Sequence, residues 1–319
     1  MKNIHSNIYK PNSINLRKAK RNIENNNVIG LPTETVYGLA ANAYSNKSIK
    51  KIFKLKKRPA FNPLIIHFKN LENLKKDVIC NNYFIKLYNA LCPGPITFIL
   101  NKNPKSKISK IAIVGKKTVA VRVPGHKVAR NLLKILDVPL AAPSANISSK
   151  LSPTCAKDVV DEFGKKVKFI LDGGRSKIGL ESTIVDLTNK PTILRHGLIT
   201  SKEINRIIKK KINIKKRSST IIAPGQLNLH YSPGIPVLMN KTRPEKNGAL
   251  ITFGKKFKND KSYFNLSKNG NLKEAANNLY KLMRLIKKKK FKYISVCKIP
   301  NFGIGRAINE RLKKASNKK

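Results

Sequence analysis

The sequence predicts an α/β fold with a large layered domain and a second, smaller domain. The chain has 319 residues, which is enough for two separate hydrophobic cores. Short apolar strands alternate with amphipathic helices through most of the chain, a pattern typical of helices packed against a sheet. Prolines and glycines interrupt this pattern before it resumes near the end. We therefore expect a domain at 1–210, a linker at 211–247 and a small α/β domain at 248–319.

The elements of the larger domain follow from hydrophobic periodicity and from turn residues. Helices are predicted at 13–26, 48–57, 81–91, 126–136, 153–163 and 201–210. Strands are predicted at 28–31, 64–68, 96–100, 119–123, 140–142, 168–171 and 182–187. Ser48 and Ser152 are expected to cap the second and fifth of these helices, because a serine hydroxyl accepts hydrogen bonds from the backbone of a first turn.

The smaller domain shows the same alternation of elements. Strands are predicted at 249–253, 263–266 and 293–297, and helices at 272–287 and 305–315. Gly303, Gly305 and Ile308 do not complete a G-x-G-x-x-G pattern, so a dinucleotide site is unsupported there. A Walker A loop is also missing around Gly115 and Lys117, so any use of ATP must be of another type.

The most informative segment is L-P-T-E-T-V-Y-G-L, from Leu31, together with the basic helix end that follows it. Pro32 stops regular strand pairing, and Gly38 permits a turn or a close approach of two backbones. Lys56 and Arg58 then sit where a helix ends and the chain turns toward the strand at 64–68, so both can reach one cleft. Such a site is typical of proteins that bind a phosphate-bearing ligand. The alternative is that Lys56 and Arg58 are solvated and interact only with the dipole of the helix.

The net charge of +51 leaves two explanations open. A basic surface attracts nucleic acid through counterion release, which favours affinity for RNA or tRNA. However, the lysines are spread over the whole chain and accompany many asparagines and isoleucines, as AT-rich codons alone would produce.

Composition also argues against several classes of protein. The sequence has no apolar run of the roughly 18 residues that cross a bilayer and no secretory leader, so we expect a cytoplasmic protein without membrane contact. The four cysteines are scattered and the histidines show no paired spacing, so neither a zinc ribbon nor a structural metal is expected.

Several motifs resemble the YrdC-like family, whose best-known members are threonylcarbamoyl-AMP synthases. The turn from Pro32 and the K-x-R helix end resemble the family's first signature. P-S-A-N-x-S at 143–148, and D-G-G with E-S-T-I-V-D at 172–186, resemble its later ones. H-Y-S-P at 230–233 and G-x-G-R-A-I-N-E-R-L at 303–312 are similar to the long two-domain form. The resemblance therefore covers nearly the whole chain.

The resemblance implies a fold and a reaction. The fold is a twisted open sheet with helices and a concave basic cavity, followed by a small Rossmann-like domain. The reaction joins L-threonine, bicarbonate and ATP into threonylcarbamoyl-AMP with release of pyrophosphate, the first step toward N6-threonylcarbamoyladenosine in tRNA. Mg²⁺ is then expected as the companion of the triphosphate without a dedicated protein site. A separate threonylcarbamoyl transferase would receive the product.

Motif match also implies which residues bind each substrate. The residues expected at L-threonine are Thr35, His67, Arg122, Ala142 and Ser182. Those expected at ATP are Lys56, Arg58, Asn62, Thr118, Ser144, Ser152, Arg195 and Tyr231. Arg122 lies in an apolar strand, where a guanidinium is costly unless it meets a carboxylate, so a ligand carboxylate or a structural ion pair are the two alternatives. Tyr231, in the linker, is expected to act as a lid over the nucleotide.

Two other functions compete with this one. A related domain occurs in carbamoyltransferases of hydrogenase maturation, but the zinc-finger cysteines of those proteins are missing here. A non-catalytic RNA-binding module is favoured by the charge. Pyrophosphate release that requires both threonine and bicarbonate separates the synthase from this module.

Overall fold

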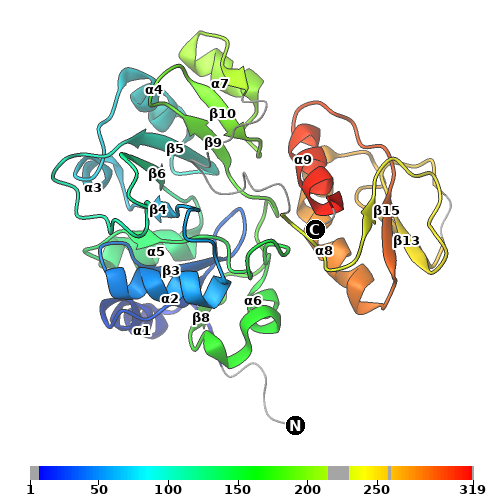
Figure 1. Ribbon diagram of the computed structural model, residues 1–319, viewed down its shortest axis with the longest axis horizontal. Helices are drawn as coiled ribbons and strands as arrows, with labels where there is room; N and C mark the ends of the chain where they lie inside the picture. Colours follow the sequence, from blue (N-terminus) through cyan, green and yellow to red (C-terminus); the bar gives the residue numbers. More distant parts are fainter. Residues whose placement is uncertain (1–6, 215–229, 258–259, 318–319) are drawn as a thin grey trace.

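A twisted mixed sheet organises the larger domain of the computed structural model, which describes residues 7–214, 230–257 and 260–317 (Figure 1). Its strand order is β1-β8-β2-β3-β7-β4-β6-β5-β9-β10-β11. These strands are β1 (Ile8–Tyr9), β2 (Ile29–Leu31), β3 (Gly38–Asn42), β4 (Ile65–His67), β5 (Ile96–Asn101), β6 (Thr118–Arg122), β7 (Leu140–Ala141), β8 (Ile170–Leu171), β9 (Thr183–Asp186), β10 (Thr192–Arg195) and β11 (Asn213–Ile214).

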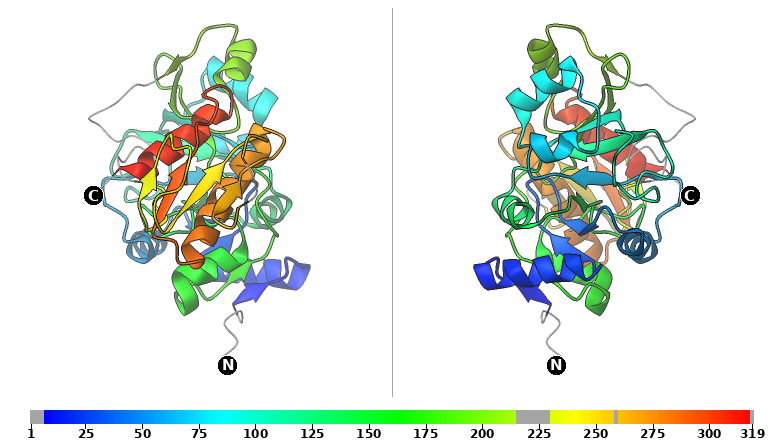
Figure 2. Two further views of the ribbon diagram at one scale, coloured as in Figure 1. Left: turned by 90° about the vertical axis from the view of Figure 1, so that its right-hand side faces the viewer. Right: turned by 90° about the vertical axis from the view of Figure 1, so that its left-hand side faces the viewer.

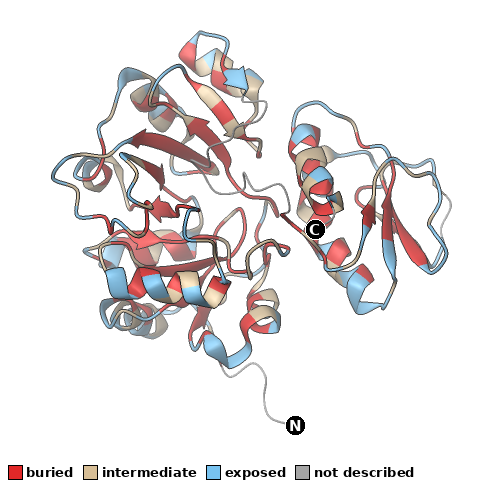
Figure 3. Ribbon diagram, viewed as in Figure 1, coloured by how far each residue is buried: buried red, intermediate tan, exposed pale blue. Residues whose placement is uncertain are grey.

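Helices cover both faces of this sheet and give it two cores. The helices are α1 (Ser13–Glu24), α2 (Asn46–Lys56), α3 (Leu71–Lys75), α4 (Asn82–Leu91), α5 (Lys127–Ile135), α6 (Ala156–Phe163) and α7 (Ser201–Ile208). Buried residues of α1 and α5 pack with Ile29 and Leu171 in one cluster. Buried residues of α2, α4, α6 and α7 pack with Ile66 and Val121 in a larger one. The central strands between them are buried almost throughout, whereas β1 and β11 at the edges of the sheet are partly or fully exposed (Figure 3). Burial of the central strands is expected where helices cover a sheet on both sides.

The smaller domain is a parallel sheet with two helices. Its strand order is β12 (Val237–Leu238), β15 (Tyr293–Val296), β13 (Gly248–Thr252) and β14 (Tyr263–Asn265). The helices α8 (Leu272–Lys288) and α9 (Gly305–Ser316) lie between this sheet and the larger domain (Figure 1, Figure 2). Among the described residues, no helix is both long enough and apolar enough to cross a lipid bilayer.

The two domains share a continuous apolar interface. Val36, Leu151 and Leu180 of the larger domain belong to the same buried cluster as the core of the smaller one. Gly179 permits this close packing, because a Cβ atom there would lie 2.7 Å from the Cα atom of Asn277 in α8. Side chains of α8 and α9 therefore sit directly behind the loop that leads into β9.

The predicted fold class is confirmed, and each predicted helix and strand has a counterpart close to the expected range. The prediction missed α3 and the strands β1, β3, β10, β11 and β12. Part of the predicted linker, residues 215–229, lies outside the described residues. Another part of it, Val237–Leu238, forms β12 and pairs with β15.

Both predicted helix caps are wrong. Helix α2 begins at Asn46, and the hydroxyl of Ser45 caps it by accepting from the backbone N–H of Ser48 at 3.2 Å. Ser48 is itself inside the helix. Helix α6 begins only at Ala156, so Ser152 precedes it and donates instead to Oε1 of Glu181 at 2.5 Å.

Candidate functional site

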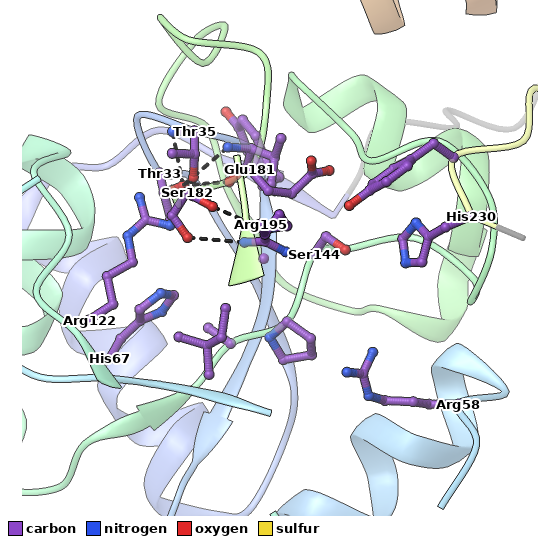
Figure 4. Close-up of a pocket in the computed structure, with 17 residues that line it drawn as sticks. Thr33, Thr35, Arg58, His67, Arg122, Ser144, Glu181, Ser182, Arg195 and His230 are labelled. Atoms are coloured by element: carbon purple, nitrogen blue, oxygen red, sulfur yellow. Dashed lines mark hydrogen bonds between the residues drawn. The ribbon is translucent and has the colours of Figure 1, made fainter. Parts of the chain in front are cut away.

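A polar pocket lies in the larger domain, and His230 and Tyr231 at the start of the second described segment also line it. Its empty space measures about 540 Å³, a value that includes open solvent at its mouth. Nine of the predicted site residues line it: Thr35, Arg58, His67, Arg122, Ala142, Ser144, Ser182, Arg195 and Tyr231. Figure 4 shows His67 and Arg122 at one end and Arg58 and His230 at the other. The remaining four predicted residues, Lys56, Asn62, Thr118 and Ser152, do not line it.

Arg122 anchors the first end of the pocket through an ion pair. Its Nη2 donates to Oε1 of Glu34 at 2.7 Å, and its Nη1 donates to the hydroxyl of Thr35 at 2.9 Å. Burial favours the neutral acid, but the charge of Arg122 outweighs it and holds the pKa of Glu34 below its ordinary value. The structural ion pair considered for Arg122 is therefore present. Nε of Arg122 and Oε2 of Glu34 are buried without a hydrogen-bond partner among the described residues.

His67 lies beside Arg122, because the parallel register of β4 and β6 pairs these two residues. Its side chain is buried, and both ring nitrogens have no partner within the described part of the chain. Burial, and secondarily the charge of Arg122, lower the pKa of His67 well below its usual value. The imidazole is therefore neutral, with one nitrogen able to donate and the other able to accept.

Arg195 and Ser182 form the adjoining wall. Arg195 Nε donates to the Ser182 carbonyl at 3.0 Å, and its Nη2 donates to the Ser182 hydroxyl at 3.1 Å. The Ser182 hydroxyl also contacts that of Thr97 at 2.7 Å. A register shift between Ile193 and Arg195 interrupts the pairing of β9 with β10. Such a bulge redirects a side chain, and here it brings a guanidinium from a short strand to the pocket.

Arg58 defines the opposite end. The helix α2 ends in a left-handed cap at Lys57, with φ of 48°, so the next residue turns toward β4. Arg58 Nε donates to the Asn62 carbonyl at 2.8 Å, and its Nη2 donates to Asn62 Oδ1 at 2.7 Å and to the Pro63 carbonyl. Asn62 thus holds Arg58 in place. Thr118 is the first residue of β6, two positions before Ala120, which pairs with Ile65 of β4.

Lys56 supports the pocket wall from behind. Its Nζ donates to the carbonyls of Ser144 and Asn146, and the side chain is 1% exposed. Burial, and secondarily Arg58, lower the pKa of this amine. Gly38 lets the same wall approach β3, because a Cβ atom there would meet the Pro143 carbonyl at 3.3 Å. Lys56 therefore fixes the segment that presents Ser144.

Tyr231 and His230 also line the pocket. Tyr231 has a φ of 62°, and its ring stacks on Tyr280 of α8 with centroids 5.9 Å apart. The guanidinium of Arg311, in α9, lies 5.3 Å from the same ring. The hydroxyl of Tyr231 is buried and has no partner among the residues that the structure describes.

Glu181 is a lining residue that sequence reasoning did not assign. Its carboxylate accepts from Ser152, from the hydroxyl of Tyr280 at 3.1 Å and from Nε of Arg311 at 3.1 Å. Burial raises its pKa, but Arg311 and Arg195 outweigh that effect and lower it overall. Thr33 and His230 also line the pocket without having been predicted. All three lie within the motifs quoted above, and this was the only signal that the sequence offered for them.

The charges of the pocket favour an anionic ligand. Three arginines line it, and the carboxylate of Glu181 is already engaged by three neighbours, Ser152, Tyr280 and Arg311. Buried guanidinium groups are stabilised by anions that accept two hydrogen bonds, such as carboxylate and phosphate. Within the described residues, no group of three or more His, Cys, Asp or Glu side chains could hold a metal ion. The side chains thus fit a carboxylate and a phosphate better than a resident metal.

Comparisons with known proteins point to one family. A family profile described as "Telomere recombination" matches residues 21–197, and one described as "Threonylcarbamoyl-AMP synthase, C-terminal domain" matches residues 199–317. The chain is 36% identical to a Pyrococcus abyssi protein named threonylcarbamoyl-AMP synthase, over 94% of each chain. It is 33% identical to a Bacillus subtilis protein of the same name, over 96% of this chain and 94% of that one. The crystal structure of P. abyssi Sua5 complexed with L-threonine is similar, with a TM-score of 0.89, 33% identity and 97% coverage of both chains.

Proposed function

Because the chain belongs to the threonylcarbamoyl-AMP synthase family, we propose that it forms threonylcarbamoyl-AMP and pyrophosphate from L-threonine, bicarbonate and ATP. The observation that carries this proposal is the convergence of Arg58, Arg122 and Arg195 on one pocket. Three guanidinium groups suit a ligand pair with one carboxylate and one triphosphate. The structure of the P. abyssi relative with bound L-threonine supports the amino-acid half of this assignment.

Threonine occupies the end of the pocket at Arg122 in this proposal. Its carboxylate accepts from Arg122 and from the hydroxyls of Thr35 and Ser182. Thr35 is already held by Arg122, and Ser182 by Arg195. Neutral His67 offers a donor or an acceptor to the amino or hydroxyl group. Ala142 supplies the apolar wall beside them.

The chemistry then needs positioning more than acid or base catalysis. The deprotonated amine of threonine attacks bicarbonate, which gives a carbamate and water. A carbamate oxygen attacks the α-phosphorus of ATP, the bond to the β-phosphate oxygen breaks, and pyrophosphate leaves. Alignment of the two reactants and stabilisation of the developing charge supply most of the rate in such a reaction.

ATP occupies the end at Arg58, Ser144 and Tyr231. Arg58 is held by Asn62 so that its guanidinium has a fixed orientation, and Lys56 holds the segment that carries Ser144. Tyr231 covers this end and excludes water from an adenylate that water would hydrolyse. Mg²⁺ enters with the triphosphate, which it neutralises when bound.

The product serves tRNA N6-threonylcarbamoyladenosine synthesis and passes to a separate threonylcarbamoyl transferase. Affinity of the basic surface for tRNA is a separate property, and binding of substrates in the pocket does not depend on it.

Pyrophosphate release by the purified protein tests the proposal. We expect release that requires ATP, L-threonine and bicarbonate together, with a threonylcarbamoyl-adenylate product detectable by mass spectrometry. Omission of each substrate in turn is the control. RNA binding without threonine-dependent release would instead identify an RNA-binding module.

A further inference from the structure

We propose that Arg311, in the last helix of the small domain, is a positioning residue that completes the nucleotide end of the pocket. It does so in two ways, by neutralising Glu181 and by supporting the ring of Tyr231. The inference rests on the proposed function, because it concerns the ATP end of that site. It implies that the active site is assembled from both domains.

The burial of Arg311 is unusual for an arginine, and its contacts explain it. The side chain has an exposed fraction of 0%. Its Nε lies 3.1 Å from Oε2 of Glu181, and its Nη1 donates to the carbonyl of His196 at 2.6 Å. Buried guanidinium groups are costly unless paired in good geometry. Both of these partners belong to the larger domain, and both lie next to strands that form the pocket.

The first role of Arg311 is electrostatic. Glu181 lines the pocket and immediately precedes Ser182, so its carboxylate lies close to any bound anion. An unpaired buried carboxylate at that place would repel a triphosphate and would compete for the guanidinium of Arg195. The ion pair with Arg311 offsets this charge from a position outside the pocket lining.

The second role is steric. Tyr231 adopts a left-handed backbone conformation, which is uncommon for a bulky residue and persists only where its surroundings hold it. The rings of Tyr280 and Tyr231 stack, and the guanidinium of Arg311 lies over the ring of Tyr231. Arg311 and Tyr280 also meet at the carboxylate of Glu181. The cluster of Arg311, Tyr280 and Glu181 therefore determines the charge at the nucleotide end and also holds the ring of Tyr231 in place.

A purely structural role in domain docking is the alternative, and the chain provides a matched control for it. Arg284, in α8, also crosses the interface, where its Nη2 donates to the carbonyl of Leu151 at 2.7 Å and its Nε lies 3.4 Å from Asp158. Arg284 does not line the pocket or contact Glu181 and Tyr231 in the described structure. Loss of Arg284 weakens docking without changing the charge of the nucleotide end.

The test compares four full-length variants with the wild type: Arg311→Met, Glu181→Gln, the double variant and Arg284→Met. Calorimetric binding of a non-hydrolysable ATP analogue measures the site without turnover. Pyrophosphate release at varied ATP and varied threonine gives KM for each substrate. Thermal melting and gel filtration confirm that each variant is folded, and Arg311→Lys serves as a milder variant if the methionine form is not.

We expect Arg311→Met to weaken analogue binding and to raise KM for ATP by about tenfold or more, with KM for threonine within about threefold. The double variant should recover most of this loss, because it removes the unpaired carboxylate. Arg284→Met should leave both values near those of the wild type. Equal losses in Arg311→Met and Arg284→Met, or no recovery in the double variant, would overturn the proposal. Absence of threonine-dependent release in the wild type would instead reject the proposed function, while analogue binding would still report on Arg311.

Discussion

Arg122 and Glu34 form an ion pair with a distance of 2.7 Å in the wall of the pocket, and their side chains are only 5% and 13% exposed. The pair fixes the orientation of the guanidinium before any ligand arrives. Such preorganisation lowers the entropic cost of binding a carboxylate. It also means that Arg122 is stabilised by the protein itself and does not depend on substrate for a partner.

Replacement of Arg122 by alanine should therefore affect threonine most. We expect a loss of about 2 to 3 kcal/mol in transition-state stabilisation, seen chiefly as a higher KM for threonine. Steady-state kinetics at varied threonine measure this loss. Arg130→Ala is the control, since Arg130 donates to the Lys69 carbonyl away from the pocket. A threonine dependence close to that of the wild type would place the carboxylate clamp elsewhere.

Replacement of Tyr231 by alanine should lower the yield of intact product without changing the affinity for threonine. In the proposed site the ring of Tyr231 lies over ATP and not over threonine, so threonine affinity should be unchanged. The amount of intact threonylcarbamoyl-adenylate should fall relative to the amount of pyrophosphate released, because water can now reach and hydrolyse the adenylate. Mass spectrometry and pyrophosphate assays on the same sample give this ratio. An unchanged ratio would remove the lid role.

Replacement of Lys56 by methionine should lower stability as well as activity. Two buried carbonyls, those of Ser144 and Asn146, lose their donor. We expect the free energy of unfolding to fall by about 2 to 4 kcal/mol, as measured by urea denaturation. Lys54→Met on the exposed side of the same helix should have no such effect. Equal stability of the two variants would show that Lys56 does not hold this wall.

His230 should make the protein less stable in mild acid. Burial lowers the pKa of His230 to about 3, so the folded state stays unprotonated while the unfolded chain takes up a proton below about pH 6.5. Between these values the unfolded state binds more protons, and stability falls by about 1.4 kcal/mol per pH unit as the pH decreases. Urea denaturation at pH 7 and pH 5 should therefore show a smaller loss in His230→Gln than in the wild type. Parallel losses would contradict a buried neutral imidazole. His67, His126 and His196 also have lowered pKa values and contribute to both proteins alike.

Removal of magnesium should stop turnover without unfolding the protein. The described residues contain no cluster of side chains that could hold a metal ion, so Mg²⁺ should act only through ATP. Excess EDTA should abolish pyrophosphate release, and added Mg²⁺ should restore it. The melting temperature without ATP should be unchanged. A lower melting temperature in EDTA would reveal a structural ion.

Hydrophobic periodicity predicted the layered fold, but it missed strands of weak propensity. Strand β3 reads G-L-A-A-N, and glycine, alanine and asparagine are poor strand formers. Its pairing is imposed by β2 and β7 on either side. Two alternatives were open for Gly38, a turn or a close approach of two backbones. The close approach is present. No turn occurs there, because Gly38 is the first residue of β3. Strand β12 is two residues long and follows two prolines, so no local signal marks it.

The candidate site was predictable where a motif carries the ligand-facing residue itself. Arg58 and Arg122 were both expected in one cleft, and both line the same pocket. A motif does not show which member of a buried group faces the cavity. The motif match therefore could not reveal that Lys56 and Ser152 lie behind the pocket wall. Arg311 was not predicted, because its partner Glu181 is 130 positions away in sequence and on the other domain.

The pairing of β1 with β8 joins Ile8 to Ile170, so the first strand has no neighbour until more than half of the chain has left the ribosome. Helix α1 has partners sooner, because the cluster that buries Ala19 and Ile23 also contains Ile29 and Leu31, but that cluster is completed only by Phe169 and Leu171. Synthesis proceeds at about 5–20 residues per second. The few apolar side chains of this segment therefore stay exposed to water for many seconds during synthesis, and the lysines and arginines of α1 supply a mutual repulsion that opposes aggregation.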